Sequence, residues 1–224
     1  MCNIIIKCIP QCSKELKEEL KNAAENAASQ VKTWFNFTTN NLEIEIYSSR
    51  QEWIEEHTRL CEKDLVSWVA GDSGRIIRVV AGNSDRQLLK MTAHECVHHI
   101  IRAVVPAIPA WLDEGLAILL LHELPDHYQE TLKLTLKQDA LLPLEVLTKP
   151  FSILDRSLKS LAYAQSYSLV EYLEDIYGRE KLRGLLISLG LGETLDHALR
   201  PMSLNRYLLE KEWERWVREY KFKL

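Results

Sequence analysis

The chain has 224 residues, of which 46% are hydrophobic and 27% are charged, and its formal net charge is −4. A chain of this length can bury a sizeable core. Its charge gives no electrostatic reason to expect nucleic acid or an anionic membrane as a partner. No apolar run approaches the roughly 20 residues that span a bilayer, and the run Ile4 to Ile6 is too short for a signal peptide. We therefore expect a cytoplasmic protein, unless a native leader precedes this sequence.

Five cysteines are present, and three of them crowd the first twelve residues, at Cys2, Cys8 and Cys12. An odd number without framework spacing argues against a set of disulfides. The spacing also matches no template for a metal site. We therefore expect reduced thiols.

The first 82 residues alternate between helical and strand-like patterns. Apolar residues recur at helical spacing from Ser13 to about Trp34, which predicts an amphipathic helix. Residues 42–49 open with strict alternation, as a half-buried strand does, and residues 50–63 have a helical pattern. Residues 65–82 contain two β-rich runs around the tetrapeptide Gly-Asp-Ser-Gly, which predicts a hairpin.

From Ser84 onward the pattern is helical nearly to the end of the chain. Ser84 and Gln87 form a capping box for a helix that must stop before Pro106, and Pro109 suits the first turn of the next helix. Residues 139–151 are a turn-rich connector. The later helix boundaries are predicted at Gly178, Gly190 and Ser203. These elements predict an α+β fold in one domain, 1–224, with an α+β part over 1–105 and a helical part over 106–224.

The segment His-Glu-Cys-Val-His, residues 94–98, lies inside the helix that begins after Ser84. Residues four apart lie one helical turn apart, so the imidazoles of His94 and His98 can reach one point beyond the helix surface. Glu95 lies about 100° round the helix from His94, beside that point, where a carboxylate can accept a proton from water. Two imidazoles and a neighbouring base are the pattern of a catalytic zinc site.

A catalytic zinc site needs a third protein ligand. The next predicted helix carries two carboxylates, Asp113 and Glu114, and a short loop at Pro106 to Pro109 would return it toward the histidines. Glu114 is the better candidate because apolar residues share its flank. Asp113 is expected to support the ligands rather than to bind the metal.

These two segments together resemble the gluzincin metallopeptidases, the relatives of thermolysin and aminopeptidase N. The chain is most similar to small bacterial peptidase-MA-like domains, over about residues 42–220. The resemblance implies a zincin-like fold with one Zn²⁺ held by His94, His98 and Glu114, the last within the segment Trp-Leu-Asp-Glu-Gly-Leu-Ala. It also implies that Glu95 is the catalytic glutamate.

The same resemblance suggests where substrate and oxyanion bind. Tyr163 matches the tyrosine that donates a hydrogen bond to the oxyanion, although Gln165 and Ser166 stand where the family often has Lys-Gly; Tyr167 is the alternative donor. Peptidases of this kind bind substrate as an added strand along a sheet edge. Residues 74–80 occupy the position of that edge strand, which makes Gly74, Arg75, Ile76 and Ile77 candidates for substrate binding.

We interpret the sequence as that of a zinc metallopeptidase acting on a peptide or protein. It lacks the Gly-x-Met-Glu-Asn segment with which the aminopeptidases bind a free amino group, so an endopeptidase is favoured. The alternatives are a catalytically silent module that docks a partner on its edge strand, and a zinc hydrolase of non-peptide amides. A further hypothesis makes the strand-like N-terminal run, residues 2–9, an autoinhibitory segment along the substrate edge.

Overall fold

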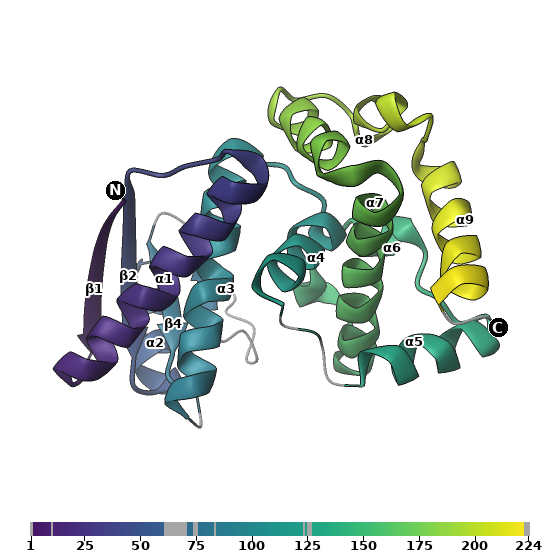
Figure 1. Ribbon diagram of the computed structural model, residues 1–224. Coiled ribbons are helices and arrows are strands. Elements are labelled where there is room, and N and C mark those ends of the chain that lie inside the picture. Colours follow the sequence, from purple (N-terminus) through teal and green to yellow (C-terminus); the bar gives the residue numbers. More distant parts are fainter. Residues whose placement is uncertain are drawn as a thin grey trace. The chain divides into compact units, whose positions relative to one another are not determined.

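The computed structural model describes residues 2–9, 11–60, 71–73, 76–82, 84–122, 124 and 127–221 (Figure 1). The chain divides into two compact units, residues 1–101 and 102–224. The residue patterns predict this boundary between residues 105 and 106. In the described parts of the chain we find no helix with both the length and the apolar character needed to cross a bilayer.

The described residues of the first unit form a small sheet and three helices. In chain order these are β1 (Asn3–Ile9), α1 (Lys14–Phe35), β2 (Asn41–Tyr47), α2 (Arg50–Leu60), β3 (Gly71–Ser73), β4 (Ile77–Val80) and α3 (Asp85–Val104), whose last turn enters the second unit. The strand order is β1-β2-β4-β3; β1, β2 and β4 are parallel, and β3 is antiparallel to β4. The fold is therefore mixed α+β, as predicted.

One face of this sheet is apolar and packs in the first unit's core. Strand partners on this face include Ile6, Ile44 and Ile77, whose side chains are almost fully buried. Helix α1 supplies a stripe of buried residues at helical spacing: Leu20, Ala24, Ala27, Val31 and Phe35. It begins where the sequence predicts, because the Ser13 side chain accepts a hydrogen bond from the backbone N–H of Leu16 at 3.1 Å.

The opposite face carries a cross-strand row of charges. Glu45 on β2 accepts a hydrogen bond from Lys7 at 3.0 Å and lies 3.3 Å from the Arg78 guanidinium, while the Tyr47 hydroxyl donates to it at 2.9 Å. Burial opposes ionisation of Glu45, but the hydrogen bonds from Lys7 and Tyr47 and the two cationic charges outweigh it and lower its pKa. Burial and the same carboxylate raise the pKa of Tyr47 to about 12.

Strand β4 corrects two predictions. It pairs with β2 on one side and with β3 on the other, so Ile77–Val80 is an internal strand and not the predicted sheet edge. Substrate binding by Ile76 and Ile77 stays a prediction. The side chain of Ile77 is fully buried, and Ile76 immediately precedes the strand. The hairpin is present, but Gly71–Ser73 forms its first strand instead of the predicted turn. Gly74 and Arg75 lie outside the described residues.

The N-terminal run also differs from expectation. β1 pairs with β2 along its whole length, from Asn3 opposite Asn41 to Ile9 opposite Tyr47, so it is an integral strand of the sheet and does not lie along β4. Cys8 and Cys12 form a disulfide, and the prediction of reduced thiols is wrong for this pair. The sequence could not reveal the pairing, because it depends on how the chain turns between β1 and α1.

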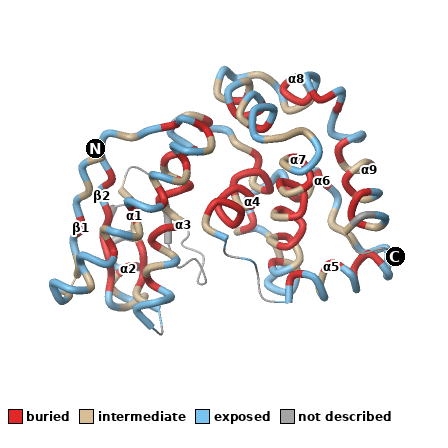
Figure 2. Tube along the Cα trace, viewed as in Figure 1, coloured by how far each residue is buried: buried red, intermediate tan, exposed pale blue. Residues whose placement is uncertain are grey.

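The second unit is helical. Its elements are α4 (Ala110–Leu121), α5 (Tyr128–Lys137), α6 (Leu144–Leu147), the 3-10 turn η1 (Phe151–Ile153), α7 (Arg156–Gly190), α8 (Leu195–Ala198), the 3-10 turn η2 (Arg200–Met202), α9 (Arg206–Trp216) and the π-helical turn η3 (Val217–Lys221). In Figure 2 the trace of α4 is red along nearly its whole length. A helix that is apolar on most sides is a core helix, and α4 is the centre of this unit.

Several helix boundaries confirm or refine the predictions. Gly178, at φ 78° and ψ 166°, interrupts α7 where a stop was predicted. α7 ends at the second predicted stop, Gly190, which is its last helical residue; a Cβ there would lie 2.5 Å from the carbonyl oxygen of Val104, and the positive φ occurs at Gly192. The N-cap of α9 is Asn205 and not Ser203. The predicted connector contains α6 and η1, and α5 was not predicted.

Candidate metal centre

Helix α3 presents two imidazoles on one face. His98 is buried and His94 is partly buried, and their rings meet edge to face with centroids 4.6 Å apart and planes at 85°. The opposite side of the helix is anchored in the core by residues such as Ala93, Cys96 and Ile100. This anchoring fixes the rotation of the helix, so that both histidines point in the same direction, as the spacing predicts.

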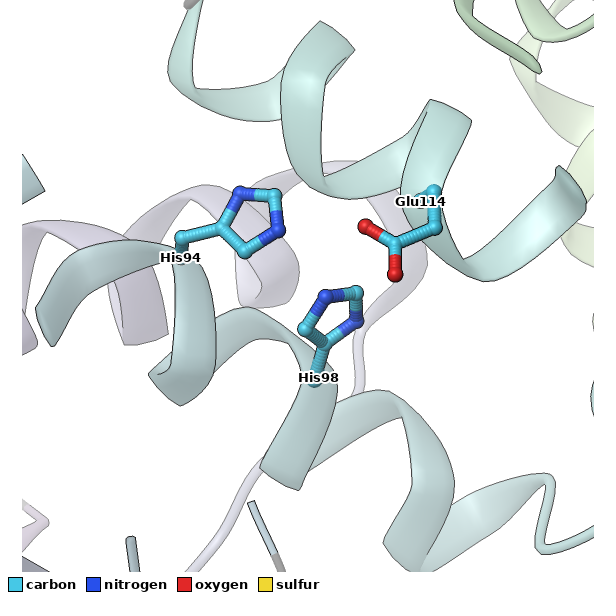
Figure 3. A group of neighbouring side chains, drawn as sticks. All are labelled: His94, His98 and Glu114. Carbon is cyan, nitrogen blue, oxygen red and sulfur yellow. The ribbon is translucent and has the colours of Figure 1, made fainter. Parts of the chain in front are cut away.

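Glu114 completes a group of three ligand residues (Figure 3). One ligand atom of each of His94, His98 and Glu114 lies within 4.8 Å of the others. Figure 3 shows the two imidazoles and the carboxylate directed toward one another. Glu114 lies on the otherwise buried helix α4 and is itself partly buried.

The donor set fits a divalent zinc ion. Two imidazole nitrogens and one carboxylate oxygen are the three protein ligands of a common class of catalytic zinc site, which keeps a fourth position open. Ligand atoms about 2.0–2.2 Å from one tetrahedral zinc lie roughly 3.4 Å apart, so side-chain shifts of about an ångström would close this group on an ion. A carboxylate this close to two imidazoles is also readily explained by a shared cation.

Glu95 follows His94 on α3 and is partly buried. Its neighbour Cys96 is fully buried, and burial, followed by the nearby Glu95 charge, raises the pKa of its thiol. A thiol held in its protonated form in the core is not a metal ligand. This agrees with the helical geometry, which directs Cys96 away from the two histidines.

An ion pair ties α4 to the last turn of α3. The guanidinium of Arg102 donates to Asp113 Oδ2 at 2.7 Å, and the Asp113 side chain is only 3% exposed. Arg102 lies one turn after His98, and Asp113 immediately precedes Glu114. The pair therefore links the helix of the histidines to the helix of the third ligand next to the ligands themselves. Asp113 has Arg102 as its partner, and its predicted role in supporting the ligands stays a prediction.

At Gly115 the backbone of α4 packs closely against α7. A Cβ at this position would lie 2.3 Å from the carbonyl oxygen of Ser166 and 2.6 Å from the Val170 side chain, both on α7. Only glycine permits so close an approach of the two helices. Packing against α7 therefore requires glycine at position 115, immediately after Glu114.

The two tyrosine candidates have different surroundings. The partly buried ring of Tyr163 packs edge to face on Phe151, with centroids 5.4 Å apart. The Tyr167 hydroxyl donates to Glu171 at 3.3 Å, and burial together with this carboxylate raises its pKa. Tyr167 donates its proton to an internal carboxylate, which argues against Tyr167 as the oxyanion donor. The oxyanion role of Tyr163 stays a prediction.

Sequence reasoning missed the roles of Arg102 and Gly115. Arg102 continues the row of His94 and His98 at a spacing of four residues, so its place on the same face could have been read from the sequence. The pairing of Arg102 with Asp113 depends on the direction that the chain takes after Pro106. The contact at Gly115 involves α7, about 50 residues away, and no local pattern indicates it.

Comparison with known proteins agrees with this geometry. A family model for the Peptidase MA superfamily matches residues 60–219, well over half of the chain and including all three ligand residues. Comparison with the curated proteins found no match. The breadth of the family match shows the relationship at the level of the superfamily, and the chain belongs to the Peptidase MA superfamily.

Proposed function

We propose that this protein is a zinc-dependent metallopeptidase of the gluzincin type, acting as an endopeptidase on peptide or protein substrates. The observation that carries the proposal is the convergence of His94, His98 and Glu114 within 4.8 Å in a chain of the Peptidase MA superfamily. Imidazole and carboxylate ligands together favour zinc over calcium or magnesium, which prefer oxygen ligands alone.

The metal would supply Lewis acidity, which polarises the substrate carbonyl and lowers the pKa of water toward 7. The chain's own residues supply the remaining chemistry. The carboxylate of Glu95 takes a proton from the attacking water and passes it to the nitrogen of the leaving amine. The Tyr163 hydroxyl donates a hydrogen bond to the oxyanion. Asp113 and Arg102 hold Glu114 in position.

The preference for an endopeptidase has its support in the sequence, which lacks a recognisable segment for binding a free amino terminus. The cytoplasmic location stays a prediction.

The test is a cleavage assay on a diverse peptide mixture, with the products mapped by mass spectrometry. Zinc-loaded protein is compared with the Glu95→Gln variant at equal zinc content. We expect internal cuts whose rate falls roughly 10²- to 10⁴-fold in the variant. Cuts confined to amino termini would contradict the endopeptidase assignment. Zinc binding without any cleavage would favour a catalytically silent binding module on the same fold.

A further inference from the structure

The outer edge of β1 has the geometry of a strand-docking site. β1 is the first strand in the order β1-β2-β4-β3, and within the described residues it pairs with β2 alone. The Asn3 N–H donates to the Asn40 carbonyl, and the Ile9 carbonyl accepts from the Ser48 N–H. Odd-numbered residues of β1 therefore direct their backbone groups toward β2. In a strand the next residues point the other way, so Ile4, Ile6 and Cys8 present theirs to the outer edge.

A groove runs beside this edge. It has a volume of about 270 Å³ and is lined by Ile4, Ile6, Lys14, Lys17, Glu18 and Lys21. Its apolar lining comes from Ile4 and Ile6, whose backbone groups also face the outer edge of β1. A peptide that paired with β1 would therefore place alternate side chains over this groove.

The charge of the groove is basic. Lys14, Lys17 and Lys21 follow one another along α1 at spacings of three and four residues, so their side chains form one row. Glu18 is the single acidic residue of the lining, against three lysines. Lys14 and Lys17 are exposed, and the ion pair recorded for Lys21, with Glu25, is long at 4.0 Å. A basic row on a protein of net charge −4 is a local feature that selects an acidic partner.

The face of β1 that carries Ile5 would contact those side chains of the partner strand that do not lie over the groove. Ile5 points away from the groove and is 50% exposed. An added strand would bring every second side chain beside Ile5, where an apolar residue would cover it. The recognition chemistry is thus a short extended segment in which acidic residues alternate with β-branched apolar residues.

We propose that β1 is a docking edge for an extended acidic peptide segment of a partner protein, added as a further strand with its carboxylates over Lys14, Lys17 and Lys21. This surface consists of residues of α1 and β1 and includes none of the candidate metal ligands, and the proposal does not depend on peptidase activity. Main-chain pairing supplies the register, and the lysines select the sign of charge.

The first test measures binding of a short fluorescent peptide of alternating valine and glutamate by anisotropy. The Glu95→Gln background keeps the peptide intact and so separates docking from turnover. We expect saturable binding that weakens as salt is added. A valine–lysine peptide, and the glutamate peptide N-methylated at alternate residues, are expected to bind at least tenfold more weakly. Equal binding of either control, or no binding at about 1 mM, would overturn the proposal.

The second test locates the site. Reversing one groove lysine, Lys17→Glu, is expected to weaken binding roughly three- to tenfold. Reversing the exposed Lys32 near the other end of the same helix, Lys32→Glu, is expected to leave binding within about twofold. Equal effects of the two substitutions would contradict the groove. Lys17→Gln, a milder change, replaces Lys17→Glu if circular dichroism shows loss of helix.

Hydrogen exchange gives a readout that needs no variant. The outward amides of Ile4, Ile6 and Cys8 are expected to gain protection when the glutamate peptide is added, while those of Ile5 and Lys7, already paired with β2, change little. Protection elsewhere in the protein but not at these three amides would overturn the proposal. Protection that rises with protein concentration in the absence of peptide would identify a second copy of the chain as the occupant, and would equally overturn it.

Discussion

Two carboxylates of this protein occupy helices in its interior and have opposite kinds of neighbours. Glu171 on α7 accepts hydrogen bonds from the Tyr128 and Tyr167 hydroxyls at 3.1 and 3.3 Å and pairs with Lys221. Its side chain is 17% exposed. Glu114 on α4 lies instead beside His94 and His98, in a group made of potential ligand atoms.

The difference separates a structural network from a binding site. The partners of Glu171 are proton donors on α5, α7 and η3, so the protein satisfies this carboxylate by itself and the network joins three elements. The neighbours of Glu114 in the group are imidazoles, which in their neutral form offer lone pairs to a metal. A cluster of ionisable residues is therefore a site candidate when its atoms can share a cation, and a structural network when donors already match acceptors.

The largest expected effect tests this contrast directly. Glu114→Gln keeps the shape of the side chain but removes its charge, and we expect zinc affinity to fall by about a hundredfold or more, since even supporting residues cost 10- to 100-fold. Glu171→Gln is the matched control, for which zinc affinity is expected to stay within about threefold. Competition with a chromogenic chelator measures both. Equal losses would show that the two clusters do not differ as we infer.

A second substitution tests how α4 is held. Gly115→Ala must displace the Ser166 carbonyl, which would lie 2.3 Å from the new Cβ, and we expect a loss of about 2–3 kcal/mol in the free energy of unfolding. Gly184→Ala, an exposed position on α7 with no heavy atom near a new Cβ, is expected to stabilise the protein by up to about 1 kcal/mol. Urea unfolding of both variants gives the comparison, and a neutral Gly115→Ala would disprove the close packing.

A third test asks whether the ion pair between Arg102 and Asp113 positions Glu114. Asp113→Asn weakens the charged hydrogen bond from Arg102, and we expect zinc affinity to fall about tenfold. Arg102→Lys keeps the charge but not the planar guanidinium, and a smaller loss is expected. The chelator assay applies again. If Asp113→Asn destabilised the fold and left zinc affinity unchanged, the pair would have a structural role alone.

The smallest effect concerns a third carboxylate, Glu45, which accepts hydrogen bonds from Lys7 and Tyr47 and lies beside Arg78. Its pKa is lowered in the folded state, so its contribution to stability is present above the ordinary glutamate pKa and is lost as the pH falls through the folded value. We expect the stability difference between the wild type and Glu45→Gln to shrink between about pH 5 and pH 3. The contribution should stay below about 1 kcal/mol. Thermal unfolding across this range measures it; a difference that grew in acid would contradict the assignment.

The sequence predicts those features of this protein that local geometry determines. The spacing of four residues in α3 brings His94 and His98 to one face, and Ser13 marks the start of α1. It does not predict features that depend on contacts across the chain. β4 was taken for an edge because its pairing with β3 was assigned to different residues. The Cys8–Cys12 disulfide spans only four residues, but it depends on the path of the chain between β1 and α1, which residue patterns do not indicate. Glu114 lies between these cases, since the apolar residues on its flank favoured it, but no local pattern shows that its helix returns to the histidines.

Helix boundaries show the same division on a smaller scale. Ser203 and Asn205 are both good capping residues, and the structure uses Asn205, whose side chain accepts from the Leu208 N–H at 2.9 Å. Ser203 takes a left-handed conformation at the end of η2. Capping propensity predicted the position of the N-cap to within two residues. The preceding turn η2, which ends at Ser203, leaves Asn205 as the N-cap of α9.

The approach of α4 to α7 at Gly115 also bears on how this protein can change in evolution. This contact is between the backbone of Gly115 and the main-chain carbonyl of Ser166. It therefore does not depend on the identity of the surrounding core side chains. Core residues near α4 can therefore drift among apolar types of similar volume while the backbone beside Glu114 keeps its place. We expect sequence variation in this unit to be broad in the apolar positions of α4 and α7 and narrow at the glycine.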